Sequence, residues 1–190
     1  MKKNNLIVFF IYFAFSANLL FAQNNEKADV VNKKTIFVDL YLGLQVSGIR
    51  KEDYVASNFA PYYQLSVGNW FTPYLALAVS YQGPYFNFIG DKVKHNYLYI
   101  DGTTILDINR LFDKEYYGRW SINLLAGGGY FYNYLYGRPN ICATTGIVGT
   151  LKLTNNFYLK CKLSNVMGWD IYQGDKDALN NMSIGGSIRF

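Results

Sequence analysis

Apolar and polar residues alternate one by one along most of the chain after residue 34. In the segment 35–46, every even position is aliphatic, from Ile36 to Val46, and the odd positions include Asp39 and Gln45. A period of two is typical of a β-strand with one apolar and one polar face, whereas a helix needs apolar residues three and four apart. The same alternation predicts further strands at about 60–70, 74–82, 95–107, 119–132, 141–153, 157–166 and 181–190.

The connections between these predicted strands alternate between long and short. Polar stretches at 47–59, 83–94, 133–140 and 169–179 are separated by connections at 71–73, 108–118 and 154–156, of which the first and the last are very short. The connection 108–118 is charged and has room for a helical turn. Because transmembrane β-barrels have short turns on one side of the membrane and long loops on the other, we expect an all-β fold. We expect this fold to be an eight-stranded antiparallel up-and-down transmembrane barrel over residues 35–190.

The first 34 residues differ from the rest of the chain. Lys2 and Lys3 precede an uncharged apolar run, and Ala22 ends the segment 1–22 with a small residue, which is the pattern of a cleavable signal peptide. The apolar run is shorter than the roughly 20 residues that a membrane-spanning helix needs. We expect 1–22 to be a signal peptide and the polar segment 23–34 to be a periplasmic N-terminal tail.

Composition supports a barrel that faces lipid. Charged residues make up 16% of the chain and aromatic residues 18%, whereas a usual soluble domain has about 25% charged residues. An aromatic-rich secreted β-sandwich is the alternative. Once Lys2 and Lys3 are removed, the remaining basic residues exceed the 13 acidic ones only slightly and form no stripe, so we expect no nucleic-acid partner.

Two cysteines and one histidine offer little metal chemistry. A three-residue turn between the predicted strands 141–153 and 157–166 pairs Gly149 with Cys161 and places Cys142 opposite Gly168. The two thiols then lie on opposite faces of the sheet, so a disulfide is disfavoured even in an oxidising compartment. There is no Cys-X-X-Cys pair, and we expect neither a metal nor another cofactor.

Charged residues at inward positions suggest what fills the barrel. A Lys or Arg that faces lipid at the membrane midplane costs roughly 2–4 kcal/mol, and an eight-stranded barrel has an interior that side chains can fill. We hypothesise that Arg189 and Asp39 pair on neighbouring strands and that a lumen charge network plugs the barrel. Its members are Asp39, Asp101, Asp107, Arg119, Lys152, Lys160, Lys162 and Arg189.

Three consecutive glycines, Gly127 to Gly129, lie within one predicted strand. A phosphate-binding loop would need a different spacing and a following helix, whereas Tyr-Phe-Tyr follows here. We expect these glycines to give room for packed lumen side chains and for bending of the strand.

Aromatic residues gather near both ends of the predicted strands, as in the interfacial girdles of membrane proteins. We expect Tyr62 and Phe86 in the outer girdle and His95 at a solvated rim. Aromatic and charged residues near the outer ends could also contact a partner, or could only anchor the rim. These candidate surface-loop contacts are Tyr54, Tyr85, Phe88, Lys92, Arg138 and Trp169.

The last predicted strand ends on an aromatic residue, Phe190, at the apolar parity. This ending resembles the C-terminal signature by which bacterial outer-membrane barrels are recognised by their assembly machinery, with Ile184, Ile188 and Phe190 as the assembly signal. With this ending and the strand pattern, residues 35–190 resemble the small OmpA/OmpX-type, opacity-protein or porin-like eight-stranded barrels. The resemblance implies the bacterial cell outer membrane, periplasmic termini, and two partners: outer-membrane lipid and the barrel assembly machinery.

Three functional classes follow from this fold. The first is a non-enzymatic surface barrel with a filled lumen and four surface loops, with a structural, adhesive or binding role toward an unidentified loop partner. The second is a narrow pore for small solutes. The third is a membrane-embedded lipid-modifying enzyme, since lipid A deacylases and palmitoyl transferases use such barrels. These enzymes need a histidine base near a serine, and His95 is followed by Asn96 and Tyr97 instead.

Overall fold

The computed structural model describes residues 35–48, 56–88, 93–113, 116, 118–169, 171 and 176–190. A short 3-10 turn, η2 (Ala56–Asn58), precedes the second strand, and helix α2 (Ile108–Phe112) joins the fourth strand to the fifth. The signal peptide (1–22) and tail (23–34) lie outside the described residues and stay predictions. The strands are β1 (Ile36–Ser47), β2 (Phe59–Trp70), β3 (Leu75–Phe88), β4 (Val93–Asp107), β5 (Trp120–Asn133), β6 (Arg138–Lys152), β7 (Phe157–Trp169) and β8 (Lys176–Arg189).

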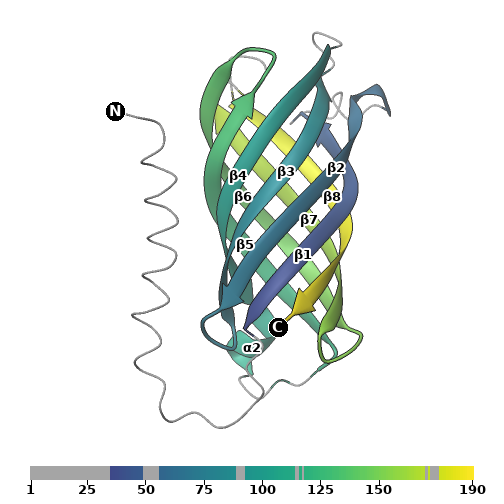
Figure 1. Cartoon of the computed structure of the whole chain (residues 1–190), viewed down its shortest axis with the longest axis vertical. Helices are drawn as coiled ribbons and strands as arrows, with labels where there is room; N and C mark the ends of the chain where they lie inside the picture. Colours follow the sequence, from purple (N-terminus) through teal and green to yellow (C-terminus); the bar gives the residue numbers. More distant parts are fainter. Residues whose placement is uncertain are drawn as a thin grey trace. The chain divides into compact units, whose positions relative to one another are not determined.

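Each strand pairs antiparallel with its neighbours in the chain, and β1 pairs with β8 to close the barrel (Figure 1). The predicted eight-stranded antiparallel barrel is therefore confirmed. We call the end with the β2–β3, β4–β5 and β6–β7 connections the turn end, and the opposite end the loop end. Figure 1 shows α2 and the C-terminus at the turn end, where the Phe190 amide also donates to the carbonyl of Ile36.

The alternation in the sequence becomes an inside and an outside in the barrel. In β1, Leu40 and Leu42 are exposed on the outside, whereas Phe37, Asp39 and Tyr41 are buried on the inside. The same division holds along the middle of the other seven strands. Inward side chains fill the interior because eight strands enclose a space only about as wide as the side chains themselves.

The strands extend further toward the loop end than the sequence predicts. β3 continues to Phe88 and β4 begins at Val93, where a long loop over 83–94 was expected, and β8 begins at Lys176 rather than 181. The apolar alternation ends where the outward residues no longer need to be apolar, but backbone pairing continues beyond that point. Sequence alternation therefore marks the apolar band and underestimates the full length of the strands.

Two turns at the turn end are built alike around a threonine. The Thr72 hydroxyl accepts hydrogen bonds from the amides of Tyr74 (3.3 Å) and Leu75 (2.9 Å). The Thr154 hydroxyl accepts from the amides of Asn156 (3.3 Å) and Phe157 (3.0 Å). In both turns the side chain satisfies amides that have left the strand ladder, which is why short polar residues are favoured there.

The register between β6 and β7 confirms the pairing of Gly149 with Cys161. Cys161 is exposed on the outside, Cys142 is buried inside, and both are free thiols. The predicted separation of the two cysteines on opposite faces is confirmed.

Candidate functional site in the barrel lumen

The inward side chains form three layers along the barrel. A charged layer in the middle, which includes Asp39, Gln64, Asp101, Lys160 and Lys162, is buried. On its loop-end side lies the loop-end cluster, composed of Phe86, Tyr97, Tyr99, Phe131, Cys142, Val166, Ile171 and Leu179. On its turn-end side lies the turn-end cluster, composed of Phe37, Ala76, Ala78, Ile105, Leu125 and Val148, with Trp70 packed against it.

Two lysines of β7 hold the charged layer together. The Lys160 ammonium donates to Asp39 Oδ2 at 2.6 Å, and both side chains are almost fully buried. Lys162 donates to Gln64 Oε1, which also accepts a hydrogen bond of 2.5 Å from the Tyr62 hydroxyl. A buried charge is costly unless it is paired and hydrogen-bonded, so these contacts explain how the barrel accommodates the lysines.

Aromatic rings close the lumen on its loop-end side. The rings of Tyr97 and Phe131 stack with centroids 5.0 Å apart, and Phe86 stacks on His95 at 4.8 Å. Gln45 connects this cluster to the wall, because its Oε1 accepts from the Tyr97 hydroxyl at 2.9 Å while its amide donates to the backbone carbonyl of Tyr85.

Three residues expected at the outer rim lie inside the barrel instead. His95 is fully buried and within hydrogen-bond distance of Asn133, at 3.1 Å, so the expectation of a solvated rim residue is wrong. Tyr62 and Phe86 are also buried rather than part of a girdle. Phe86 and His95 stand at inward positions where β3 and β4 extend further than the apolar alternation, whereas Tyr62 stands at an inward position within the predicted strand 60–70.

Arg189 closes the turn-end side of the lumen without the expected partner. Its guanidinium lies 4.0 Å from the centre of the Tyr158 ring and 5.1 Å from that of Trp70. The ion pair of Asp39 is formed with Lys160, so the predicted pairing of Arg189 with Asp39 is wrong. Lys160 reaches Asp39 over β8, the single strand between β7 and β1, whereas Arg189 stands nearer the mouth, where its flat guanidinium lies over aromatic rings.

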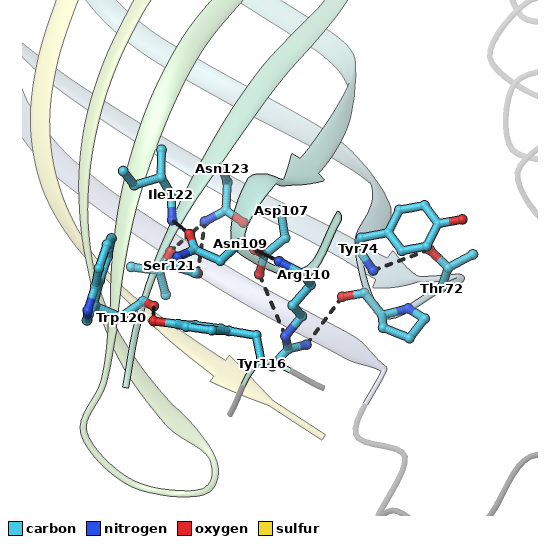
Figure 2. Close-up of polar contacts among 12 residues, drawn as sticks. Thr72, Tyr74, Asp107, Asn109, Arg110, Tyr116, Trp120, Ser121, Ile122 and Asn123 are labelled. Carbon is cyan, nitrogen blue, oxygen red and sulfur yellow. Dashed lines mark hydrogen bonds and ion pairs between the residues drawn. The ribbon is translucent and has the colours of Figure 1, made fainter. Parts of the chain in front are cut away.

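Asp107 is buried but serves the β4–β5 connection rather than the charged layer. Its carboxylate accepts from the Arg110 amide at 3.2 Å, which caps α2, and lies 3.8 Å from Arg110 Nε. Arg110 also donates to the Pro73 carbonyl at 3.3 Å, and Figure 2 shows Asn109 bound to the amide of Ile122. A side-chain oxygen at the start of a helix satisfies an amide that the helix leaves free, which accounts for this position of Asp107.

Two other members of the predicted charge network lie outside the lumen. Arg119 precedes β5 and Lys152 is the last residue of β6, and both side chains are exposed at the turn end. Their parity is inward, but they stand at the rim, where the barrel opens and long side chains reach water. Asp39, Asp101, Lys160 and Lys162 remain as the charged residues that the middle of the lumen brings together.

The candidate surface-loop contacts are dispersed. Tyr54 and Lys92 lie outside the described residues. Tyr85 and Phe88 belong to β3 rather than to a loop, and the Lys94 ammonium lies 3.6 Å from the centre of the Tyr85 ring. Arg138 and Trp169 are exposed at strand ends of the loop end.

The outer surface of the barrel is apolar around its middle. Leu42, Leu163 and Ile184 are each about three-fifths exposed, far more than aliphatic side chains of a water-soluble core. A closed barrel satisfies all of its ladder hydrogen bonds internally, which is what hydrocarbon surroundings require. This surface is that of a transmembrane barrel.

Within the parts of the chain that the structure describes, no three His, Cys, Asp or Glu side chains are grouped as a metal site. In the same residues, no helix is long and apolar enough to cross a membrane.

No protein-family model and no curated protein matches the chain. Among solved structures, Neisserial surface protein A (NspA) is similar with a TM-score of 0.55 and 13% identity, over 82% of this chain and 97% of that one. The N-terminal β-barrel domain of Pseudomonas aeruginosa OprF has a TM-score of 0.49 and 16% identity, over 81% of this chain and 97% of that one. The outer membrane enzyme PagL has a TM-score of 0.49 and 12% identity, over 80% of this chain and 99% of that one.

At such low sequence identities the similarity concerns the fold alone. The comparison with NspA, at a TM-score of 0.55, supports this similarity of fold. The strand number, the closure and the apolar exterior agree with that similarity. The chain therefore has the fold of the small eight-stranded outer-membrane β-barrels of the OmpA/OmpX type.

Proposed function

We propose that this protein is a non-enzymatic, integral outer-membrane barrel with a lumen closed by its own side chains, and that it acts through its loop end. The observation that carries the proposal is the three-layered lumen. The Lys160–Asp39 ion pair lies in the middle, and apolar clusters pack against both sides of the charged layer. A barrel filled in this way has a structural, adhesive or binding role, with the turn end in the periplasm.

The position of His95 argues against a lipid-modifying enzyme. A general base must lie within hydrogen-bond reach of the group that it activates. His95 is fully buried between Phe86 and Tyr136, with ring centroids 4.8 Å and 5.3 Å away. Lipid on the outside of the barrel would not reach this imidazole.

The alternative function is a narrow pore for small solutes. A conductance measurement distinguishes such a pore from the closed barrel. We expect the protein, reconstituted in planar bilayers, to give no stepwise single-channel conductance, because the ion pair and both apolar clusters occupy the lumen. Heat-modifiable migration of the same preparation on SDS gels shows that the barrel is folded. Stable conductance steps from the heat-modifiable form would contradict the proposed filled lumen and favour the pore.

We also propose that Ile184 and Ile188 of β8, together with Phe190, which directly follows this strand, are recognised by the barrel assembly machinery. All three side chains are exposed. Replacement of Phe190 by alanine is expected to lower the amount of protein in the outer membrane severalfold, while refolding into detergent micelles in vitro changes little. Met182→Ala is the matched control, since Met182 is similarly exposed on the same strand. Equal outer-membrane levels of both variants and the wild type would contradict a role for Phe190 in assembly.

The loop end is the proposed contact surface, and the exposed Arg138 and Trp169 are its described candidates. Tyr54 and Lys92 stay predictions. If this surface binds a partner, Trp169→Ala should weaken binding of cells to that partner without changing barrel migration on gels. Unchanged binding would contradict a contact role for Trp169 and would indicate that its ring only anchors the rim.

A further inference from the structure

Two basic residues stand next to each other on the rim of the turn end. The Lys152 amide donates to the Arg119 carbonyl at 2.6 Å, and both side chains are exposed. Neither side chain forms an ion pair with another described residue. Arg110 and Arg189 at the same end are engaged, the first with Asp107 and the second with aromatic rings. Arg119 and Lys152 thus present two charges at one place that no described side chain pairs with.

Large apolar side chains are exposed at the same end of the barrel, two of them next to these bases in the chain. Trp120 and Leu153, the residues that follow Arg119 and Lys152 in the chain, are 55% and 53% exposed. On α2, Phe112 is 85% exposed. The connection is fixed to β5 by two hydrogen bonds, because Asn109 accepts from the Ile122 amide at 2.8 Å and the Tyr116 hydroxyl donates to the Trp120 carbonyl at 2.8 Å. Figure 2 shows both contacts.

We infer that this rim sector, formed by Arg119, Trp120, Lys152 and Leu153, binds the headgroup of an anionic phospholipid in the leaflet at the turn end. Arginine and lysine are suited to phosphate oxygens, and arginine can bind two of them at once. Tryptophan is favoured at the level of the headgroups, and the leucine lies along the acyl chain. The inference rests on the proposed membrane location.

The combination of charges and apolar surface favours a lipid over a soluble anion. A dissolved phosphate would contact Arg119 and Lys152 only, whereas a lipid in the same leaflet also lies against Trp120 and Leu153. An anionic lipid satisfies both kinds of side chain at once. Two basic residues at an anionic membrane surface are expected to favour the charged lipid over a zwitterionic one about tenfold at low salt.

Trp120 provides the probe for the test. A chain with Trp70→Phe and Trp169→Phe keeps Trp120 as its single tryptophan and is reconstituted in phosphatidylcholine vesicles. Brominated phosphatidylglycerol is added to one set and brominated phosphatidylcholine to the other, since bromine quenches indole fluorescence on contact. We expect phosphatidylglycerol to occupy the site about tenfold more strongly. We also expect Arg119→Gln with Lys152→Gln to abolish this preference, whereas Lys94→Gln with Arg138→Gln at the loop end leaves it unchanged.

The outcomes separate this inference from the proposed function. Equal quenching by both lipids would overturn the lipid site while leaving the barrel in the membrane. Absence of quenching by either lipid would instead contradict the membrane location. Loss of the preference on addition of millimolar inorganic phosphate would overturn lipid recognition in favour of a soluble anion. If the tryptophan variants do not fold, native mass spectrometry of the unmodified chain counts bound phosphatidylglycerol, and equal retention by the Arg119→Gln, Lys152→Gln variant would overturn the inference.

Discussion

Replacement of Gly129 by alanine is expected to prevent closure of the barrel or to lower its free energy of unfolding by more than about 3 kcal/mol. Gly129 faces the lumen on β5, directly opposite Asp101 on β4. A methyl group at this position would overlap the carbonyl oxygen of Ile100 and lie 2.5 Å from Asp101 Cα. Both are backbone atoms of the neighbouring strand, so a rotamer change cannot relieve the overlap. Heat-modifiable migration and urea unfolding in detergent micelles measure the effect.

Gly102 on β4 offers a matched control for Gly129. It faces outward, and a methyl group added there would have nothing within 4 Å. Gly102→Ala should therefore change the free energy of unfolding by no more than about 0.5 kcal/mol. If the two variants unfold at the same urea concentration, the strands do not approach each other at Gly129 as described.

The second large effect is expected at the buried ion pair. Asp39→Leu leaves the Lys160 ammonium in the lumen without its carboxylate, and we expect it to lower the free energy of unfolding by about 3–5 kcal/mol. Lys160→Met should cost a similar amount, because it leaves the Asp39 carboxylate without its cation. Urea unfolding followed by tryptophan fluorescence measures both variants.

The double variant tests whether the pair itself causes these losses. A buried ion pair replaced by apolar residues of similar volume is often close to neutral in stability. Asp39→Leu with Lys160→Met is therefore expected to be more stable than either single variant. Losses that simply add would mean that the two side chains do not interact across the lumen.

The sequence predicts the fold well because the barrel's two faces differ in chemistry at every residue. The alternation in 35–46 and the parity of Cys161 and Gly149 were enough to predict β1, the β6–β7 register and the separation of the cysteines. Strand ends at the loop end were not predictable in this way, because the outward residues there need not be apolar. Phe86 and His95 were misplaced for that reason.

The alternation predicts which side chains face the lumen, but not at which level along the barrel axis each of them lies. Lys160 and Asp39 both have inward parity, yet nothing in the sequence indicates that β7 and β1, separated by β8, bring them to the same level. Arg119 and Lys152 share that parity and are still exposed to solvent, because they stand at the rim. The aromatic layer of Tyr97 and Phe131 was overlooked, although their odd positions on neighbouring strands β4 and β5 were a signal for it.

The central claim, a transmembrane barrel with apolar residues outward, is tested most directly at Cys161. With Cys142 replaced by serine, a nitroxide label on Cys161 in reconstituted vesicles reports its surroundings by electron paramagnetic resonance. Cys161 is exposed on the outside of β7 beside outward Ile184 of β8, so the label should collide often with oxygen, which dissolves in lipid, and rarely with a water-soluble nickel chelate. A label more accessible to the nickel chelate than to oxygen would contradict the lipid-facing exterior.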